Sequence, residues 1–373
     1  MQYRRFGNTD LNISALGFGA MRMPTIEKDG KTIIDEPAAI GMIRHAIDNG
    51  INYVDTAYFY HDGQSEVVVG KALQDGYRER TYIATKSPVW LIKEEEDFEK
   101  ILDEQMQKLQ VDYIDFYLLH ALDKSRFKDI VLKYDLINKM IKLKEEGKIK
   151  YMGFSFHDSL DVFKEIIDST DQWDFCQIQF NYIDITHQAG QEGLEYAGKK
   201  GIPVVIMEPL LGGKLANLPK NVKDVLDPKK DPVEWALDFL WDRPEVALLL
   251  SGMSTPKQLE DNLIYADRSF IGMLKDEEKA MLKEAKRIYD TMALVSCTKC
   301  RYCLPCPSGL LIPDIFEAYN MTVSAGMKKA KEKYDEFDVK ASDCVKCRAC
   351  EIECPQHIEI SQVMTDVDNV FAK

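Results

Sequence analysis

The sequence predicts an α/β protein: a (β/α)8 TIM barrel followed by a smaller, mainly helical domain. Two observations predict it. Eight apolar, β-branched stretches alternate with amphipathic helical patterns over about 270 residues, the usual size of such a barrel. Eight of the nine cysteines then lie in the last 77 residues. We therefore divide the chain of 373 residues into a barrel at 1–292 and a cysteine-rich domain at 293–373.

The predicted strands are apolar along most of their length, as strands covered on both faces are. They are Ala15–Ala20, Ile51–Ala57, Thr81–Lys86, Tyr113–His120, Lys150–Phe156, Phe175–Phe180, Pro203–Glu208 and Val246–Ser251. An open, doubly wound sheet is the competing arrangement, because periodicity alone does not distinguish it from a closed barrel. A small hairpin, Tyr3–Phe6 with Leu11–Ile13, is expected ahead of the first strand.

Helical patterns fill the intervals between these strands. In the first, Ile40, Ile43 and Ile47 share one face of a helix that stops at a Gly50 turn. A later helix is expected over Asp276–Thr291, at the end of the barrel. The interval between the two cysteine runs is also expected to be helical and contains a basic stretch, Lys328–Lys333. We interpret that stretch as a solvated helix face, with a docking surface for an acidic electron carrier as the alternative.

Charge and hydropathy exclude several function classes. Lys and Arg number 48 and Asp and Glu 62, so the net charge of −14 argues against binding to nucleic acid or an anionic membrane. No uncharged apolar run approaches the roughly 18 residues that a membrane span needs. The N-terminus carries Arg4 and Arg5 without an apolar stretch behind them, so we expect no secretory signal and a cytoplasmic location.

Three successive predicted strands each end in an ionisable residue. Asp55 ends the second strand, Lys86 the third and His120 the fourth, and Tyr60 follows five residues after Asp55. In a barrel these strand ends meet at one rim, where chemistry is found. We expect Asp55 to pair with Lys86, and the ammonium to lower the pKa of Tyr60 from about 10 so that the phenol acts as a general acid. His120 would then orient a substrate carbonyl.

This pattern resembles the aldo-keto reductase family. The matching motifs are Asp55-Thr56-Ala57 with Tyr60, Ser65-Glu66 with Gly70, Thr85-Lys86, Asp112–His120, Gly153-Phe154-Ser155, Gln177, Pro209-Leu210 with Gly212-Gly213, and Asn262. The resemblance covers about residues 1–290 and implies a nicotinamide cofactor, NADP or NAD, that reduces a carbonyl or oxidises an alcohol. It also implies catalytic roles for Asp55, Tyr60, Lys86 and His120, and cofactor contacts at Ser155, Gln177, Met207, Leu210, Gly212 and Asn262.

Several positions depart from the family pattern. Phe156 stands where the family has Asn, and Met207 and Glu208 stand where an aromatic residue and a Ser are usual. Gly252 and Gln258 occupy the places where many members carry a Lys and an Arg for the 2′-phosphate of NADPH. These departures leave the choice between NADP and NAD open, and a flavin in the barrel is an alternative.

The cysteine tail predicts two [4Fe–4S] clusters. Its second run, Cys344-x2-Cys347-x2-Cys350-x3-Cys354-Pro355, has the bacterial ferredoxin spacing, in which the fourth cysteine binds the other cluster. We therefore assign Cys297, Cys300, Cys303 and Cys354 to one cluster, and Cys344, Cys347, Cys350 and Cys306 to the second. Zinc, the competing reading, pairs two C-x2-C units and leaves the third cysteine of each run unexplained. Cys176, on a predicted strand, is expected to be a core residue.

Three functions remain open at this point. The first is a reductase of the aldo-keto type whose clusters relay electrons between the barrel and a ferredoxin or flavodoxin. The second is an electron-transfer module, flavin-linked or not, in which the barrel mainly docks partners. The third is an ordinary reductase whose clusters are structural. A small carbonyl or alcohol compound is the expected substrate in the first and third.

Overall fold

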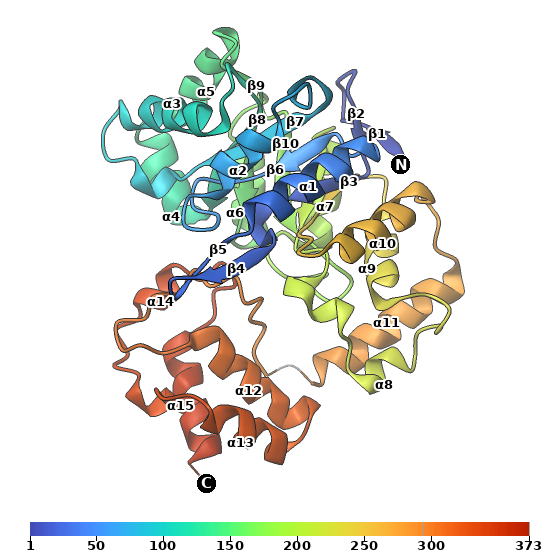
Figure 1. The fold of residues 1–373 in the computed structure, drawn as a ribbon, viewed down its shortest axis with the longest axis vertical. Coiled ribbons are helices and arrows are strands. Elements are labelled where there is room, and N and C mark those ends of the chain that lie inside the picture. The colour runs from blue at the N-terminus through green and yellow to red at the C-terminus, as the bar shows by residue number, and fades with distance from the viewer. Residues whose placement is uncertain (293, 373) are drawn as a thin grey trace. The chain divides into compact units, whose positions relative to one another are not determined.

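Eight parallel strands close into a barrel in this computed structural model, which describes residues 1–292 and 294–372 (Figure 1). The strands are β3 (Leu16–Gly19), β6 (Tyr53–Asp55), β7 (Tyr82–Ser87), β8 (Ile114–Leu122), β9 (Ile149–Phe156), β10 (Phe175–Gln179), β11 (Val204–Met207) and β12 (Val246–Ser251). They follow one another around the barrel in chain order, and β12 pairs with β3 to close it. The predicted barrel is confirmed over the open sheet, and each of the eight predicted strands is present.

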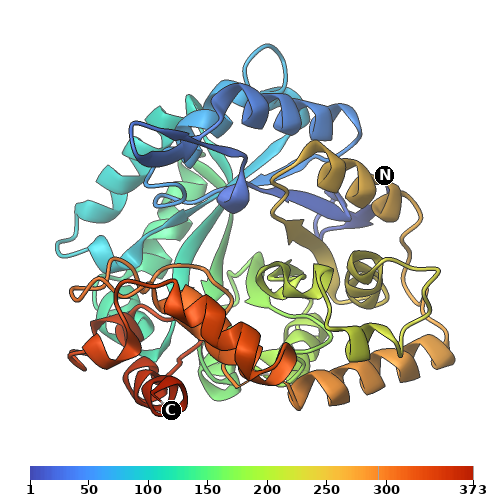
Figure 2. The same ribbon diagram turned by 60° about the horizontal axis from the view of Figure 1, so that its bottom comes forward.

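Helices surround the strands of the barrel (Figure 2). They are α1 (Glu36–Asp48), α2 (Ser65–Ala72), α3 (Asp97–Leu109), α4 (Lys124–Arg126), α5 (Leu136–Glu145), α6 (Leu160–Asp168), α7 (Gly190–Lys199), α9 (Pro232–Trp241) and α10 (Pro256–Asp267). Their ends carry the expected signals. The Asp35 side chain accepts from the backbone N–H of Ala38 to cap α1, and Thr255 caps α10 in the same way.

The N-terminal hairpin packs at the end of the barrel where the strands begin. Strands β1 (Tyr3–Arg5) and β2 (Asn12–Ser14) pair antiparallel, as the sequence predicts. The residue that follows β1, Phe6, is fully buried, and its ring lies 5.1 Å from that of Phe116 on β8. Tyr53 and Phe175 begin their strands and also contact Phe116, with ring centroids 5.0 and 5.3 Å away. This aromatic layer fills the barrel at the N-terminal ends of its strands.

A second hairpin was not predicted. Strands β4 (Thr25–Lys28) and β5 (Lys31–Ile34) pair antiparallel around Asp29 and Gly30, whose φ angles are 53° and 72°. Asp-Gly is a strong two-residue turn signal because both positions need positive φ. The flanking residues are mostly exposed and lack an apolar face, so strand periodicity gave no second indication.

The chain divides into two compact units. One contains Met1–Pro209 and Ala236–Leu274, and the other contains Leu210–Trp235 and Lys275–Lys373. Segments 210–235 and 275–292 therefore group with the cysteine-rich tail, so the single boundary at 292 stays a prediction. Within the described ranges, no helix is long and apolar enough to cross a membrane.

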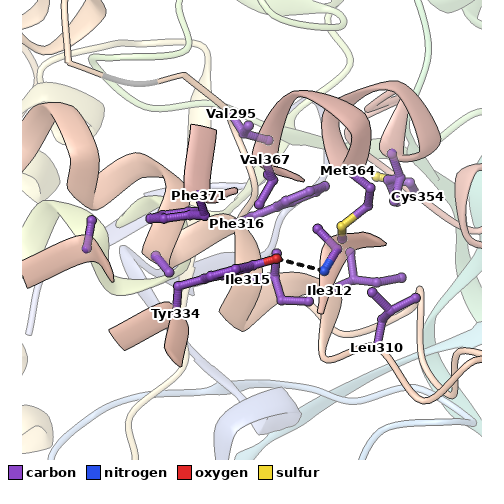
Figure 3. Close-up of a cluster of buried hydrophobic side chains, with 14 residues drawn as sticks. Val295, Leu310, Ile312, Ile315, Phe316, Tyr334, Cys354, Met364, Val367 and Phe371 are labelled. Carbon is purple, nitrogen blue, oxygen red and sulfur yellow. Dashed lines mark hydrogen bonds between the residues drawn. The ribbon is translucent and has the colours of Figure 1, made fainter. Parts of the chain in front are cut away.

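The second unit is mainly helical. It contains α8 (Lys220–Lys223), α11 (Asp276–Asp290), α12 (Ile312–Ser324), α13 (Met327–Asp335), α14 (Ala349–Ile352) and α15 (Ile360–Phe371). Its tail has a hydrophobic cluster of its own, in which the ring of Tyr334 stacks on that of Phe371 at 4.2 Å (Figure 3). The Tyr334 hydroxyl accepts a hydrogen bond of 2.8 Å from the backbone N–H of Ala341. Cys354 and Met364 belong to the same cluster, so one of the predicted iron ligands lies in the core.

Gly70 provides a test of helix packing in the barrel. A Cβ atom on Gly70 of α2 would stand 2.6 Å from the carbonyl oxygen of Leu109 at the end of α3. Gly70→Ala is therefore expected to lower the free energy of unfolding by about 1–3 kcal/mol, the usual cost of an overpacked contact. Thermal and urea unfolding followed by circular dichroism would measure it.

The matched control is Gly41→Ala, on the exposed face of α1. A Cβ there meets no atom within 4 Å. Because alanine favours a helix over glycine, this variant is expected to gain about 0.5–1 kcal/mol. Equal effects of the two substitutions would contradict the packing argument.

Candidate active site and cysteine cavities

The four predicted catalytic residues lie together at the C-terminal rim of the barrel. Asp55 is the last residue of β6, Lys86 is the next-to-last residue of β7, and His120 is near the end of β8. Tyr60 is held by the turn after β6, where its backbone N–H donates to the carbonyl of Ala57. Three adjacent parallel strands end at one edge, which brings these side chains into one buried group.

The Lys86 ammonium is wholly buried and fixed by three hydrogen bonds. Its Nζ donates to both carboxylate oxygens of Asp55 at 2.7 Å and to the carbonyl oxygen of Thr56 at 2.8 Å. The same Nζ lies 3.4 Å from the hydroxyl oxygen of Tyr60. Burial raises the pKa of Asp55 and lowers that of Lys86, and the charge of each partner opposes the shift in the other.

The pKa of Tyr60 differs from the prediction. Burial, together with the negative charges of Asp55 and Glu208, raises the pKa of Tyr60 well above its ordinary value. The expected lowering by Lys86 is wrong for this state of the protein, because Asp55 already neutralises the ammonium at 2.7 Å. Tyr60 is therefore held as a neutral phenol, the form that can donate a proton.

His120 faces Tyr60 and is neutral at pH 7. The two rings meet edge to face with centroids 6.3 Å apart. Burial, followed by the charges of Lys86, His157 and Arg126, lowers the pKa of His120 well below its ordinary value. A neutral imidazole has one N–H donor and one acceptor nitrogen. His120 can thus donate a hydrogen bond to a carbonyl oxygen without bringing a charge into the site.

A buried polar network behind Lys86 was missed from the sequence. Gln105 on α3 donates from Nε2 to Glu66 at 2.6 Å and to the carbonyl oxygen of Lys86 at 3.1 Å. Tyr117 on β8 donates to the Oε1 of Gln105 at 2.8 Å, and Thr85 donates to Glu66 at 2.7 Å. The available signal was a glutamine on the apolar face of α3, among Phe98, Ile101, Leu102 and Leu109. This network fixes the backbone that carries the ammonium.

The predicted cofactor contacts are divided between the two units. Ser155, Gln177 and Met207 lie on adjacent strands β9, β10 and β11, and Gln177 Nε2 is 3.5 Å from the sulfur of Met207. Asn262 on α10 is buried and donates to Ser251 at 3.0 Å. Leu210 and Gly212 belong to the second unit. There Gly212 has a φ of 65°, and a Cβ on it would collide with the carbonyl oxygen of Thr298.

Two of the departures from the family pattern have a structural basis. Phe156, where the family has Asn, is fully buried and packs edge to face on Phe163 with ring centroids 5.1 Å apart. Gly252 leaves room for the side chain of Arg22, whose carbons lie 3.1–3.3 Å from the place of a Cβ. The aliphatic carbons of an arginine from another part of the sequence therefore lie beside the position that the family fills with Lys.

The eight tail cysteines line two small cavities in the second unit. Cys297, Cys300, Cys303 and Cys354 line one, and Cys306, Cys344, Cys347 and Cys350 line the other. The structure therefore brings together the two sets of four that the sequence assigned to separate clusters. In the ranges 1–292 and 294–372, no three His, Cys, Asp or Glu side chains are arranged to hold a single metal ion. Four thiols around a shared cavity are the ligand number that a [4Fe–4S] cluster takes.

The two cysteine runs share one loop conformation. In the first run Lys299 and Arg301 flank Cys300 and have φ angles of 57° and 68°. In the second, Lys346 and Arg348 flank Cys347 with φ angles of 55° and 60°. The sequence Lys-Cys-Arg is thus repeated with the same left-handed pair of residues, which turns the chain tightly enough for cysteines three apart to face one cavity.

The barrel and its rim define an oxidoreductase that acts on carbonyl or alcohol groups. The chain belongs to the aldo/keto reductase family, whose profile matches residues 15–286. A 4Fe-4S dicluster domain matches residues 296–359. The predicted resemblance is confirmed for both parts of the chain.

Relatives of this chain include a named dehydrogenase and an uncharacterized oxidoreductase. L-galactose dehydrogenase of Arabidopsis thaliana is 26% identical over 314 residues, covering 77% of this chain and 96% of that protein. The uncharacterized oxidoreductase YqkF of Bacillus subtilis is 27% identical over 320 residues, with 77% and 97% covered. Among solved structures, the holo form of aldo-keto reductase AKR11C1 from Bacillus halodurans has a TM-score of 0.64 at 26% identity, covering 76% of this chain and 96% of that one.

The buried, neutral His120 predicts a pH-dependent stability. Its folded pKa is lowered, and an unfolded His titrates near 6.5. Below that pH the unfolded state binds the proton more readily, so stability is complete above pH 6.5 and is lost as the pH falls toward the folded pKa. Between pH 7 and pH 5.5 the wild type should lose about 1 kcal/mol more than His120→Asn. Urea unfolding at both pH values measures this, and parallel losses in the two proteins would contradict it.

Proposed function

We propose that this chain is a nicotinamide-dependent reductase of carbonyl compounds, or the reverse alcohol dehydrogenase, in which two [4Fe–4S] clusters relay single electrons. One observation carries the reductase: the Lys86 Nζ is held by Asp55 and Thr56 and lies 3.4 Å from the Tyr60 hydroxyl. The cluster relay is supported by the two cavities, each lined by four cysteines.

Each of the rim residues has its own role in the reduction. When bound, the nicotinamide supplies a hydride for the carbonyl carbon. Tyr60 donates its hydroxyl proton to the carbonyl oxygen, which completes the alcohol, and His120 orients that oxygen by a hydrogen bond. The proton leaves a phenolate, and the Lys86 ammonium beside it stabilises the new negative charge. In the oxidising direction the same phenolate accepts the proton of the alcohol.

The residues of the barrel fit a nicotinamide. The buried Oε1 of Gln177 has no hydrogen-bond partner among the described residues, and it would accept from the carboxamide N–H of the ring. Ser155 and Asn262 would contribute polar contacts, and Met207 would pack on the ring. The contacts expected of Leu210 and Gly212, which belong to the second unit, stay predictions. An aldo-keto reductase from Klebsiella pneumoniae, 24% identical and with a TM-score of 0.62, is solved in complex with NADPH.

The clusters connect the barrel chemistry to one-electron carriers. Hydride transfer moves two electrons and a cubane moves one, so the two chemistries couple only through a group that does both, such as a flavin. The external partner that we propose for the clusters is a ferredoxin or flavodoxin. Of the eight tail cysteines, Cys347 is exposed, and the others are partly or fully buried. Cys347 lines the second cavity, so a partner could approach the cluster bound there.

An electron-transfer module with a flavin is the second candidate. The observation that favours it is a cavity of about 460 Å³ in the second unit, lined by residues that include Cys297, Lys214 and Tyr289. Its volume is within the range of small-molecule sites. In this function the cluster chemistry would not depend on the phenol of Tyr60.

Tyr60→Phe tests the reductase directly. Removing the proton donor should lower kcat for carbonyl reduction by about 10²–10⁴-fold, the usual contribution of a general acid, with little change in KM. Anaerobic assays with NADPH and NADH and a set of aldehydes and ketones would measure it. Tyr58→Phe, in the same turn but bonded to Glu104 instead, is the matched control and should keep its activity. Unchanged turnover in Tyr60→Phe, or cluster reduction as the sole activity of the wild type, would favour the second candidate.

Cys354→Ser tests the assignment of ligands. Cys354 closes the first set although it lies in the second run, so its loss should remove one cluster and lower the iron content from about eight to about four per chain. Because Cys354 is part of the hydrophobic cluster, thermal stability of the tail should fall as well. Iron and sulfide analysis with electron paramagnetic resonance would measure the effect. Cys176→Ala, on β10 in the barrel, should retain both clusters, and equal iron loss in both variants would contradict the assignment.

A further inference from the structure

The segment that links β3 to β4, residues 20–24, contacts the turn after β6 that carries the catalytic phenol. Both leave the rim at the same place, because Gly19 at the end of β3 is paired in register with Asp55 at the end of β6. The Ser65 hydroxyl donates to the carbonyl oxygen of Ala20 at 3.2 Å in a buried contact. This bond fixes the far end of the turn to the segment.

A second contact is made by His61, the residue that follows the phenol in the chain. Its Nε2 accepts a hydrogen bond of 3.2 Å from the backbone N–H of Met23, whose side chain is buried. The ring also has a hydrogen bond with the backbone of Met21. The same segment is held to the loop after β12, where the Ser254 hydroxyl donates to the carbonyl oxygen of Arg22 at 2.8 Å. His61 therefore ties the turn to a fixed part of the rim.

The backbone at His61 indicates that its side chain is needed. His61 and Asp62 have φ angles of 52° and 53°, and Gly63 follows with 83°. A residue other than glycine is uncommon at positive φ, and such residues collect at functional sites. Glycine would fit this backbone at position 61 with less strain, but it has no ring that could reach Met23. The imidazole thus accounts for a strained residue directly beside the phenol.

The His61 ring is in the protonation state that the contact with Met23 requires. An imidazole nitrogen accepts a hydrogen bond only when it carries no proton. Burial lowers the pKa of His61, and the charge of Asp62 and the hydrogen bond with Met21 oppose that shift only in part. The ring is therefore neutral at pH 7 and has one acceptor nitrogen.

We propose that His61 is a positioning residue for the reaction, which holds the Tyr60 hydroxyl where it meets the substrate carbonyl. It acts through the turn and not on the reacting atoms. The turn needs such a hold because the Lys86 Nζ is 3.4 Å from the hydroxyl, longer than the usual N–H···O distance of about 2.7–3.2 Å. This inference rests on the proposed reductase function and adds a residue to its machinery.

Two substitutions at one position test the inference. His61→Leu removes the acceptor and keeps an apolar side chain, whereas His61→Gln places an amide oxygen within reach of the Met23 N–H. The full chain with intact clusters is assayed anaerobically with NADPH and NADH and a set of aldehydes. In His61→Leu kcat should fall about 10–100-fold with KM unchanged, because a misplacement of about 1 Å can cost about 100-fold. In His61→Gln most of kcat should be retained.

Asp62→Asn is the matched control in the same turn. Asparagine adopts a positive φ more readily than most residues, and the substitution removes a charge beside the ring but leaves the ring in place. This variant should keep the wild-type kcat. A wild-type kcat in His61→Leu, or equal losses in His61→Leu and His61→Gln, overturns the inference.

Failure of the reductase function itself would be recognised separately. If the wild type reduces no aldehyde, the proposed function fails, and amide hydrogen exchange then decides whether His61 holds the turn. Peptides that contain Met23 are followed by mass spectrometry. Loss of one hydrogen bond should speed the exchange of the Met23 amide about 10-fold in His61→Leu, with little change in His61→Gln. Equal exchange in the wild type and His61→Leu overturns the inference.

Discussion

The buried ammonium of Lys86 is the constraint on which the rest of the rim depends. An ammonium with no solvent contact is costly unless it is paired and hydrogen-bonded. Asp55 and the Thr56 carbonyl meet that requirement because β6 and β7 are neighbours in register, with Asp55 opposite Ala84. Gln105 holds the Lys86 carbonyl from behind. The Lys86 Nζ also lies 3.4 Å from the Tyr60 hydroxyl, so the paired ammonium stands beside the phenol.

The same pairing explains why proximity to Lys86 does not lower the pKa of Tyr60. A lysine near a phenol lowers its pKa only if the positive charge is not already neutralised. Asp55 is 2.7 Å from the ammonium and Tyr60 is 3.4 Å away, so burial and the carboxylates decide the direction of the shift. The stabilisation by Lys86 then matters when the proton has left and the phenolate has formed. The residue types were readable from the sequence, but this order of distances was not.

Much of the fold could be predicted because its signals are local. The eight strands are continuous apolar runs, and the grouping of the cysteines follows from their spacing in two runs. The Gln105 and Tyr117 network could not be predicted, since its members come from α3 and β8 and meet only after the barrel closes. The β4–β5 hairpin was missed because its strands bury almost no apolar surface, although the Asp29-Gly30 turn signal was present. The assignment of Leu210 and Gly212 to the second unit also depends on tertiary contacts, such as that with Thr298.

The two cysteine loops have the same backbone turn but different surroundings, and this difference bears on how electrons would pass. Cys354 is buried in the hydrophobic cluster with Phe316 and Met364, and it faces the first cavity. Cys347 is exposed and faces the second. Solvent exposure and hydrogen bonds around the sulfurs set the potential of a cluster, so two cubanes in these places would not be equivalent. Under the proposed function the second cluster, beside the exposed Cys347, would exchange electrons with a carrier, and the first would lie beside the buried Cys354.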